Sequence, residues 1–312
     1  MADDLGDMYE MVAKRLLSGK VVPVLGAGAN LGDRPPGVSF EPGGRYLPNG
    51  RELAEVLARS ANYPNADVFD LARVSQYVAA MLGEDELYEE LHKIFNADYP
   101  PTSLHRFLAR LARHTREAST NGCMLLVTTN YDDALERAFQ DEGEPYDLVT
   151  YINDVEKDRG YFRHTPFRGE PVVIRIPNEY TGLPLDQRTI IAKIHGAVDR
   201  VSHGDSFVIT EDHYIDYITR ADIERLFPVT LADKIKRSHF LFLGYSLRDW
   251  NVRVMLYRLR RKGTRRKSWA IEADPDPVDR VTWDERGVDI LHDRVEDFVA
   301  AIEQRLPPRE AA

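Results

Sequence analysis

The stretch VVPVLGAGAN, residues 21–30, decides how this chain is expected to fold. A short apolar run, typical of a buried strand, leads directly into Gly26, Ala27 and Gly28. Two glycines one residue apart at a strand end usually leave room for something against the backbone, commonly a phosphate. The next glycine, Gly32, comes one residue later than in the dinucleotide fingerprint, and no helix begins promptly. The motif alone therefore indicates a ligand site without identifying the ligand.

Several later segments repeat the pattern of a short, apolar, β-rich run. They are residues 123–129, 189–194 and 239–244, with a further strand predicted within 172–176. Helical patterns lie between these runs, and one of them follows the last strand from residue 252 onward. Strands that are apolar throughout and alternate with helices are typical of a parallel sheet covered on both faces. We therefore expect a Rossmann-like α/β fold with a doubly wound, mostly parallel sheet.

We interpret residues 1–312 as one domain with an elaboration. Residues 31–50 are so rich in glycine and proline that they predict a loop, and long loops are often functional or mobile. Residues 51–118 show helical periodicity throughout and predict an all-helical insertion. Residues 258–312 are expected to complete the same domain with a strand and a helix. The loop and the insertion are where a gate would lie.

Composition narrows the function classes. The 312 residues carry a formal charge of −10, which argues against a protein that mainly wraps nucleic acid. A single cysteine, Cys123, excludes a disulfide framework and a zinc site built on several thiolates, and its apolar setting predicts a core residue. The first ten residues are acidic where a signal peptide is basic, and no run of about 18 apolar residues occurs. We expect a cytoplasmic protein without a membrane segment.

The basic run RLRRKGTRRK, residues 258–267, has two interpretations. A solvated helix end and turn is favoured over contact with a partner or a nucleic acid. Direct binding of nucleic acid is therefore not expected.

Polar residues follow four of the predicted strands, and open parallel sheets bind ligands beyond the carboxyl ends of their strands. We predict a polar cleft there, with Asn130 and His195 as catalytic candidates. The candidates for binding a cofactor are Gly26, Ala27, Gly28, Asn30, Thr129, Asp132, Gly196, Gly244, Tyr245 and Ser246.

Taken singly, these residues also fit structural roles. His195 could be a core histidine, and Asn130 could be the N-cap of a helix over residues 131–139. Ser246 is not expected to be a hydrolase nucleophile, because GYSLR lacks the second glycine of the elbow motif. The sequence contains no His-Glu-x-x-His motif, acidic calcium loop or lysine-bearing phosphate loop, so no metal is expected.

In combination, four motifs resemble the sirtuin family, and more closely its bacterial branch of NAD-consuming defence proteins. They are GAGAN at 26–30, TTNYD at 128–132, KIHGAVD at 193–199 and FLGYSLRDWN at 242–251. Two departures separate this chain from deacylase sirtuins. One cysteine cannot build their four-cysteine zinc ribbon, and DRPPGVSF replaces their Gly-Ile-Pro-Asp-Phe-Arg segment. The resemblance therefore implies an NAD pocket and favours cleavage of NAD with water as the acceptor.

The chemistry is consistent with that implication. Nicotinamide leaves NAD as a neutral group from a cationic linkage, so the site must supply orientation, electrostatic stabilisation and a positioned nucleophile. Asn130 can hold ribose hydroxyls and a water, and His195 can act as a general base. We expect the N–H groups of residues 26–28 to hold the pyrophosphate. Asp132 is expected to orient its neighbours or cap the helix, while Gly244 and Ser246 line the adenosine side.

The resemblance also implies biology. Such proteins are typically oligomers held inactive until a phage signal or a partner protein, such as a ring-forming ATPase, releases them to deplete NAD in abortive infection. The main alternative is a non-catalytic module that senses NAD or ADP-ribose. A protein deacylase and a nucleic-acid-processing subunit are weaker alternatives. Hydrolysis versus cyclisation of the ADP-ribose product stays open.

Overall fold

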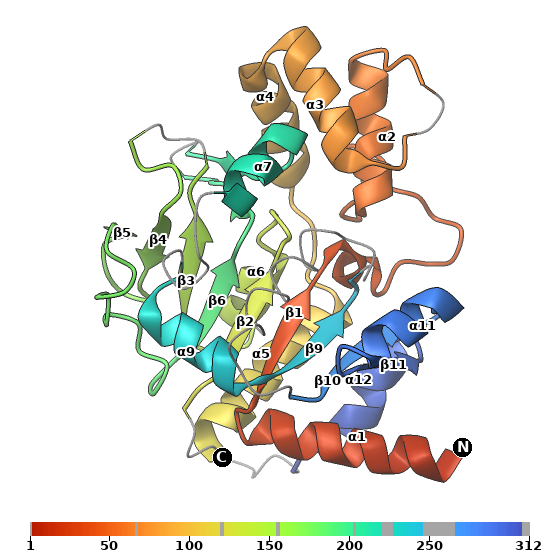
Figure 1. Ribbon diagram of the computed structural model, residues 1–312, viewed down its shortest axis with the longest axis vertical. Coiled ribbons are helices and arrows are strands. Elements are labelled where there is room, and N and C mark those ends of the chain that lie inside the picture. The colour runs from red at the N-terminus through yellow and green to blue at the C-terminus, as the bar shows by residue number, and fades with distance from the viewer. Residues whose placement is uncertain are drawn as a thin grey trace.

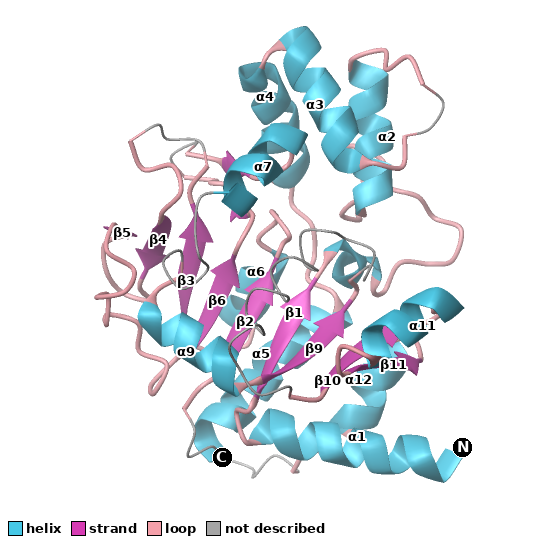
Figure 2. Ribbon diagram, viewed as in Figure 1, coloured by secondary structure: helices cyan, strands magenta, loops and turns pink. Residues whose placement is uncertain are grey.

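A nine-stranded sheet forms the centre of the protein, with helices on both faces (Figures 1 and 2). The structure is a computed structural model that describes residues 2–65, 68–118, 122–153, 157–201, 204–219, 227–245 and 266–307.

The strands confirm the expected topology. The order across the sheet is β11-β10-β9-β1-β2-β6-β3-β4-β5, parallel throughout except at the β3–β4 and β4–β5 pairs. The large sheet comprises β1 (Val21–Leu25), β2 (Leu125–Thr128), β3 (Tyr146–Tyr151), β4 (Phe162–Thr165), β5 (Val172–Ile174), β6 (Thr189–Lys193), β9 (His239–Leu243), β10 (Ser268–Glu272) and β11 (Val288–His292). A separate small sheet pairs β7 (Gly196–Ala197) with β8 (Ser206–Phe207). The chain leaves β1 on one side for β2 and returns on the other side as β9, which makes β1–β9 a topological switch point.

The helices and one 3₁₀ helix surround this sheet. They are α1 (Ala2–Leu17), η1 (Ala27–Leu31), α2 (Gly50–Ser60), α3 (Leu71–Leu82), α4 (Glu84–Phe95), α5 (Ser103–Ala118), α6 (Ala134–Asp141), α7 (Glu211–Thr219), α9 (Val229–Arg237), α11 (Pro277–Asp284) and α12 (Val295–Glu303).

Strand β1 shows why these runs are apolar throughout. All five of its residues are buried. Val22 and Val24 point into the core shared with α9, whereas Val21 and Leu25 point into the core shared with α1, α5 and α12. Because both faces are covered, neither face of the strand can carry polar residues.

The helical insertion is shorter than the sequence predicts. Helices α2, α3 and α4 form a cap with its own apolar core, which Figure 1 shows standing beyond the carboxyl ends of the strands. Helix α5, included in the predicted insertion over 51–118, instead packs on the sheet against α1, α6 and α12. Its apolar stripe, which includes Leu104, Phe107, Leu108 and Leu111, is buried there. Periodicity showed that this segment is helical, but it could not show which surface covers the stripe.

The loop that precedes α2 is anchored to that helix. The Arg34 guanidinium lies 2.6 Å from Glu52 Oε1, and both side chains are largely buried. Glu52 also accepts hydrogen bonds from the backbone N–H groups of Phe40 and Asn49. Although burial raises the pKa of Glu52, the bonds from Arg34 and the two N–H groups outweigh it and lower that pKa below its usual value. The loop therefore has a fixed attachment to the cap.

Some predicted features lie outside the described residues. These are the helix expected from residue 252 and residues 258–265 of the basic run. At the end of that run, Lys267 Nζ lies 2.6 Å from Asp289 Oδ2, across the neighbouring strand β11.

Burial of His105 predicts that stability depends on pH. This histidine in α5 accepts a hydrogen bond from the Thr102 backbone N–H at its Nδ1, and burial lowers its pKa from 6.5 to about 4. The unfolded chain therefore binds more protons between these two values, so stability falls as the pH drops through that range. From pH 7 to pH 5 we expect this residue to remove about 2 kcal/mol from the free energy of unfolding.

Denaturant titrations at both pH values check this expectation. His105→Asn keeps a hydrogen-bond acceptor at the start of α5 but removes the titrating group. Between pH 7 and pH 5, this variant should therefore lose about 2 kcal/mol less stability than the wild type. Equal losses in the two proteins would contradict the assignment.

Candidate functional site

A large cleft lies at the carboxyl ends of the central strands, beneath the cap. Its volume is about 1970 Å³. Most of the predicted site residues line it, namely Gly26, Ala27, Gly28, Asn30, Thr129, Asn130, Asp132, His195, Gly244 and Tyr245. Gly196 is not among the lining residues, and Ser246 lies outside the described residues. Segments as far apart in the chain as those of Gly26 and Tyr245 thus meet at one edge of the sheet.

The glycines after β1 hold the floor of this cleft together. The Gly28 N–H donates to the Gly244 carbonyl at 2.8 Å, and the Gly26 N–H donates to the Leu243 carbonyl at 3.1 Å. A Cβ atom built on either glycine would lie 2.7 Å from the Gly244 carbonyl oxygen. Gly244 itself has φ of +61°, and its own Cβ would lie 2.0 Å from the Ala29 nitrogen. Two loops at the switch point therefore touch backbone to backbone.

This contact changes the expected role of the motif. We predicted that the N–H groups of residues 26–28 would hold a pyrophosphate. Those of Gly26 and Gly28 already donate to main-chain carbonyls of β9 and the residue after it, so they are not available to a ligand in this conformation. Close packing of the two loops is therefore sufficient to explain the glycines, whether or not a ligand also binds there.

Replacing Gly28 tests this explanation. Gly28→Ala should lower the free energy of unfolding by about 1–3 kcal/mol, because the new methyl group overlaps backbone that cannot rotate away. Gly6→Ala in α1 is the matched control, since nothing lies within 4 Å of its Cβ and alanine favours the helix. Denaturant unfolding measures both. Wild-type stability in Gly28→Ala would mean that the glycine serves the ligand alone.

Asn130 lies at the end of β2, facing β1. Its Nδ2 donates to the Gly26 carbonyl at 3.1 Å, and its backbone N–H donates to Thr128 Oγ1 at 3.0 Å. The residue is 8% exposed and lines the cleft. The alternative role as an N-cap is wrong, because α6 begins at Ala134 and Asp133 takes the N-cap position. Asn130 is thus held by the glycine loop.

Asp132 is the centre of a buried polar network behind the cleft. Its Oδ2 accepts from Asn30 Nδ2 at 2.9 Å, and its Oδ1 accepts from the Ala134 N–H at 3.1 Å. Lys193, only 1% exposed, donates to the Asp132 carbonyl and lies 2.7 Å from Glu136 Oε1. Burial raises the pKa of Glu136 although Lys193 opposes the shift. The network fixes the loop between Thr128 and Ala134, which carries Asn130.

His195 follows β6, where it is both buried among aromatic rings and exposed to the cleft at its edge. It is 3% exposed, and its ring packs edge-on against Tyr214 and Tyr217, with centroids 5.4 and 5.6 Å away. It nevertheless lines the same cleft as Asn130. The two tyrosines come from α7, so that helix fixes the plane of the imidazole.

Gly196 has a structural role. Its φ is +85°, and a Cβ there would lie 2.0 Å from the Ser206 carbonyl oxygen, across the small β7–β8 sheet. The glycine lets the chain turn directly after His195.

Sequence reasoning missed the residues that the cap and α7 contribute to the cleft. They include Arg51, Tyr63, Phe69, Phe95 and Tyr214. The Arg51 guanidinium carbon lies 4.3 Å from the centroid of the Phe69 ring, a geometry typical of a cation–π contact. No motif marks these positions, because their place in the cleft depends on how the cap sits over the strands.

The described ranges contain neither a cluster of metal-ligating side chains nor a membrane-spanning helix. No group of three or more His, Cys, Asp and Glu residues is arranged to hold a metal ion there. Among the helices of the same ranges, none combines the length and the apolar character needed to cross a membrane.

The protein has an α/β fold with a large cleft at the switch point of its sheet. A family model described as SIR2-like domain matches residues 124–291, more than half of the 312 residues. The chain therefore belongs to the SIR2-like family.

The individual proteins that this chain resembles share only low sequence identity with it. Defense-associated sirtuin 2 of Bacillus subtilis is 22% identical over 76% of this chain and 20% of its own length. NAD(+) hydrolase ThsA of Acinetobacter baumannii is 28% identical over 68% of this chain and 36% of its own length. The matched region thus spans a fifth to about a third of these relatives. A solved structure described as "Structural Basis for the Mechanism and Regulation of Sir2 Enzymes" is 14% identical over 96% of both chains, with a TM-score of 0.40.

Proposed function

We propose that this protein is an NAD glycohydrolase that cleaves NAD to nicotinamide and ADP-ribose. The observation that carries the proposal is that Asn130 and His195 line one cleft at the switch point of a SIR2-like fold. The similarity to proteins named NAD(+) hydrolase supports the same substrate.

The cleft fits an extended dinucleotide. Its volume of about 1970 Å³ exceeds the roughly 300–1,000 Å³ of common small-molecule sites, so room is sufficient for both nucleotides. Polar groups of Asn130 and His195 lie toward β2 and β6, whereas Gly244, Tyr245 and Ile271 line the side toward β9 and β10. We assign the first side to the nicotinamide ribose and the second to the adenosine.

The residues on the nicotinamide side have distinct tasks. The bond to nicotinamide breaks without a general acid, because the base leaves as a neutral molecule from a cationic linkage. Asn130, fixed by Gly26, would hold a ribose hydroxyl and the attacking water. His195 would take a proton from that water or hydroxyl, a contribution of about 10²–10⁴-fold for a general base. Its packing against Tyr214 and Tyr217 would keep the imidazole oriented.

We further propose a biological setting by analogy with the named relatives. The protein would be an NAD-depleting effector of bacterial anti-phage defence, cytoplasmic and oligomeric, and controlled by a partner protein such as a ring-forming ATPase. The names of the defence-associated sirtuin and the NAD hydrolases support the defence role and the chemistry. Oligomer, partner and location are carried over from the family alone.

The alternative function is a module that senses NAD or ADP-ribose without cleaving it. The deep burial of His195 favours this alternative, because a histidine enclosed by tyrosines has limited access to water.

Nicotinamide release from NAD by the purified protein separates the two functions. We expect release by the wild type, and a loss of about 10²-fold or more in His195→Ala and in Asn130→Ala. His114→Ala, which changes a half-exposed histidine of α5 that does not line the cleft, should match the wild type. Calorimetric binding of NAD runs alongside. NAD that binds but stays intact would favour the sensor, and full activity in both variants would place the chemistry elsewhere.

A further inference from the structure

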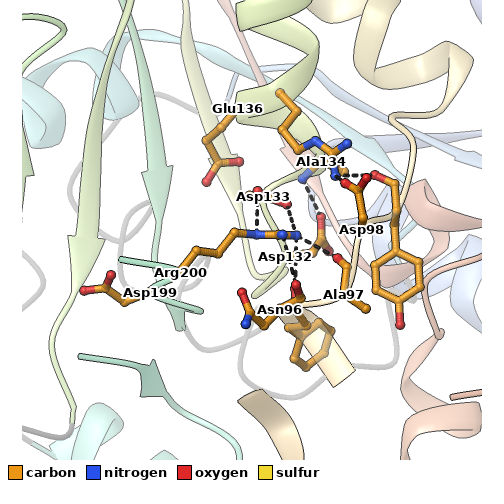
Figure 3. A network of polar contacts seen from close by, with 12 residues as sticks. Asn96, Ala97, Asp98, Asp132, Asp133, Ala134, Glu136, Asp199 and Arg200 are labelled. Atoms are coloured by element: carbon orange, nitrogen blue, oxygen red, sulfur yellow. Dashed lines mark hydrogen bonds and ion pairs between the residues drawn. The ribbon is translucent and has the colours of Figure 1, made fainter. Parts of the chain in front are cut away.

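One guanidinium joins three segments around the site, as Figure 3 shows. Arg200 lies five residues after His195, beyond the small strand β7. It reaches the carboxyl end of α4 in the cap and the loop that carries Asn130. These contacts connect the cap to the catalytic strand ends.

The first set of contacts caps α4. Arg200 Nη1 donates at 3.0 Å to the carbonyl of Asn96, the C-cap of α4. Nη2 donates to the carbonyl of Phe95, the last residue of the helix, at 3.4 Å, and to the Ala97 carbonyl just beyond it at 2.7 Å. The last carbonyls of a helix lack partners within the helix, and a positive charge there is favourable. Arg200 thus holds the segment that directly follows α4, where the chain leaves the cap.

The second set of contacts reaches the loop between Thr128 and Ala134, which carries Asn130 and is called the catalytic loop below. Arg200 Nε and Nη2 lie 2.8 and 2.9 Å from the two carboxylate oxygens of Asp133. Only the Nη2 contact is a hydrogen bond, while Nε adds a close charge contact, and together they hold the carboxylate beside the guanidinium. Asp133 follows Asp132 directly and lies three residues after Asn130, so the same guanidinium also holds that loop.

An aromatic contact runs parallel to this ion pair. Phe95, the last residue of α4, packs edge-on against Tyr131 with centroids 5.4 Å apart. Tyr131 in turn donates from its hydroxyl to the Val208 carbonyl at 2.8 Å. Tyr131 is the immediate neighbour of Asn130, and both rings line the cleft. The end of α4 therefore supports the catalytic loop from two directions.

We propose that Arg200 is a positioning residue that sets the place of Asn130 by tying the catalytic loop to the end of α4. The proposal rests on the proposed function, because it assigns Arg200 a part in the same reaction. It also makes the cap a support for the chemistry rather than only a cover, so displacement of α4 would lower turnover.

Arg200→Met tests the proposal, with Arg137→Met as the matched control. Arg137 holds the same connecting segment, with Nη1 2.8 Å from the Tyr99 carbonyl and 2.5 Å from Asp98 Oδ1, but it extends from α6 and not from the His195 strand end. We expect Arg200→Met to lower kcat about tenfold, with KM for NAD changed less than about twofold, since Asn130 acts on the reacting ribose. Arg137→Met should retain the wild-type kcat.

Arg200→Lys adds a conservative variant. Lysine keeps the charge at the end of α4, but its single ammonium cannot reach the Asn96 and Ala97 carbonyls and Asp133 together as the guanidinium does, so kcat should be restored only in part. Combining Arg200→Met with Asp133→Asn should lower kcat by much less than the product of the single effects.

Hydrogen–deuterium exchange without NAD keeps the proposal testable if the protein does not cleave NAD. Exchange in residues 128–133 should rise in Arg200→Met and stay at the wild-type rate in Arg137→Met, with circular dichroism confirming that both are folded. Wild-type kcat together with wild-type exchange in Arg200→Met would overturn the coupling. Absence of activity in the wild type, with the expected exchange, would overturn the proposed function and leave the coupling standing.

Discussion

The backbone contact between Gly28 and Gly244 is the constraint on which the site depends. Parallel pairing places the ends of β1 and β9 side by side, and the chain diverges from β1 to the two halves of the sheet. Because both loops lack side chains at the crossing, the Gly28 N–H reaches the Gly244 carbonyl at 2.8 Å. That crossing forms the floor of the cleft and gives Asn130 an acceptor, the Gly26 carbonyl, at a fixed position.

Behind this floor, several buried polar side chains are hydrogen-bonded to one another and to the main chain. Lys193 is almost fully buried and donates hydrogen bonds to Glu136 and to the Asp132 carbonyl. Asn30 donates a hydrogen bond to the Asp132 carboxylate. Removing one partner from such a network leaves a buried group unpaired, which is far more destabilising than loss of a surface pair. The network therefore ties the loop between Thr128 and Ala134 to β6, the strand that His195 follows.

The sequence predicts much of this arrangement because its strongest signals are local. The apolar runs at β1, β2, β6 and β9 are read from a few adjacent residues, and glycines and polar residues at their ends indicate a cleft. The sequence could not show that Asp133 rather than Asn130 is the N-cap of α6, or that α5 belongs to the sheet layer. It also could not show that the N–H groups of Gly26 and Gly28 donate to the Leu243 and Gly244 carbonyls. Each depends on a contact between segments far apart in the chain. For the same reason, the sequence could not identify the residues of the cap that line the cleft.

The most direct test of the central claim is a crystal structure of the His195→Ala variant with NAD. The variant should retain the substrate uncleaved. The account predicts that NAD lies across the β1–β9 switch point, with the nicotinamide ribose within hydrogen-bond distance of Asn130 and the adenosine beside Gly244 and Tyr245. NAD bound outside this cleft, or with its nicotinamide ribose away from Asn130, would contradict the account.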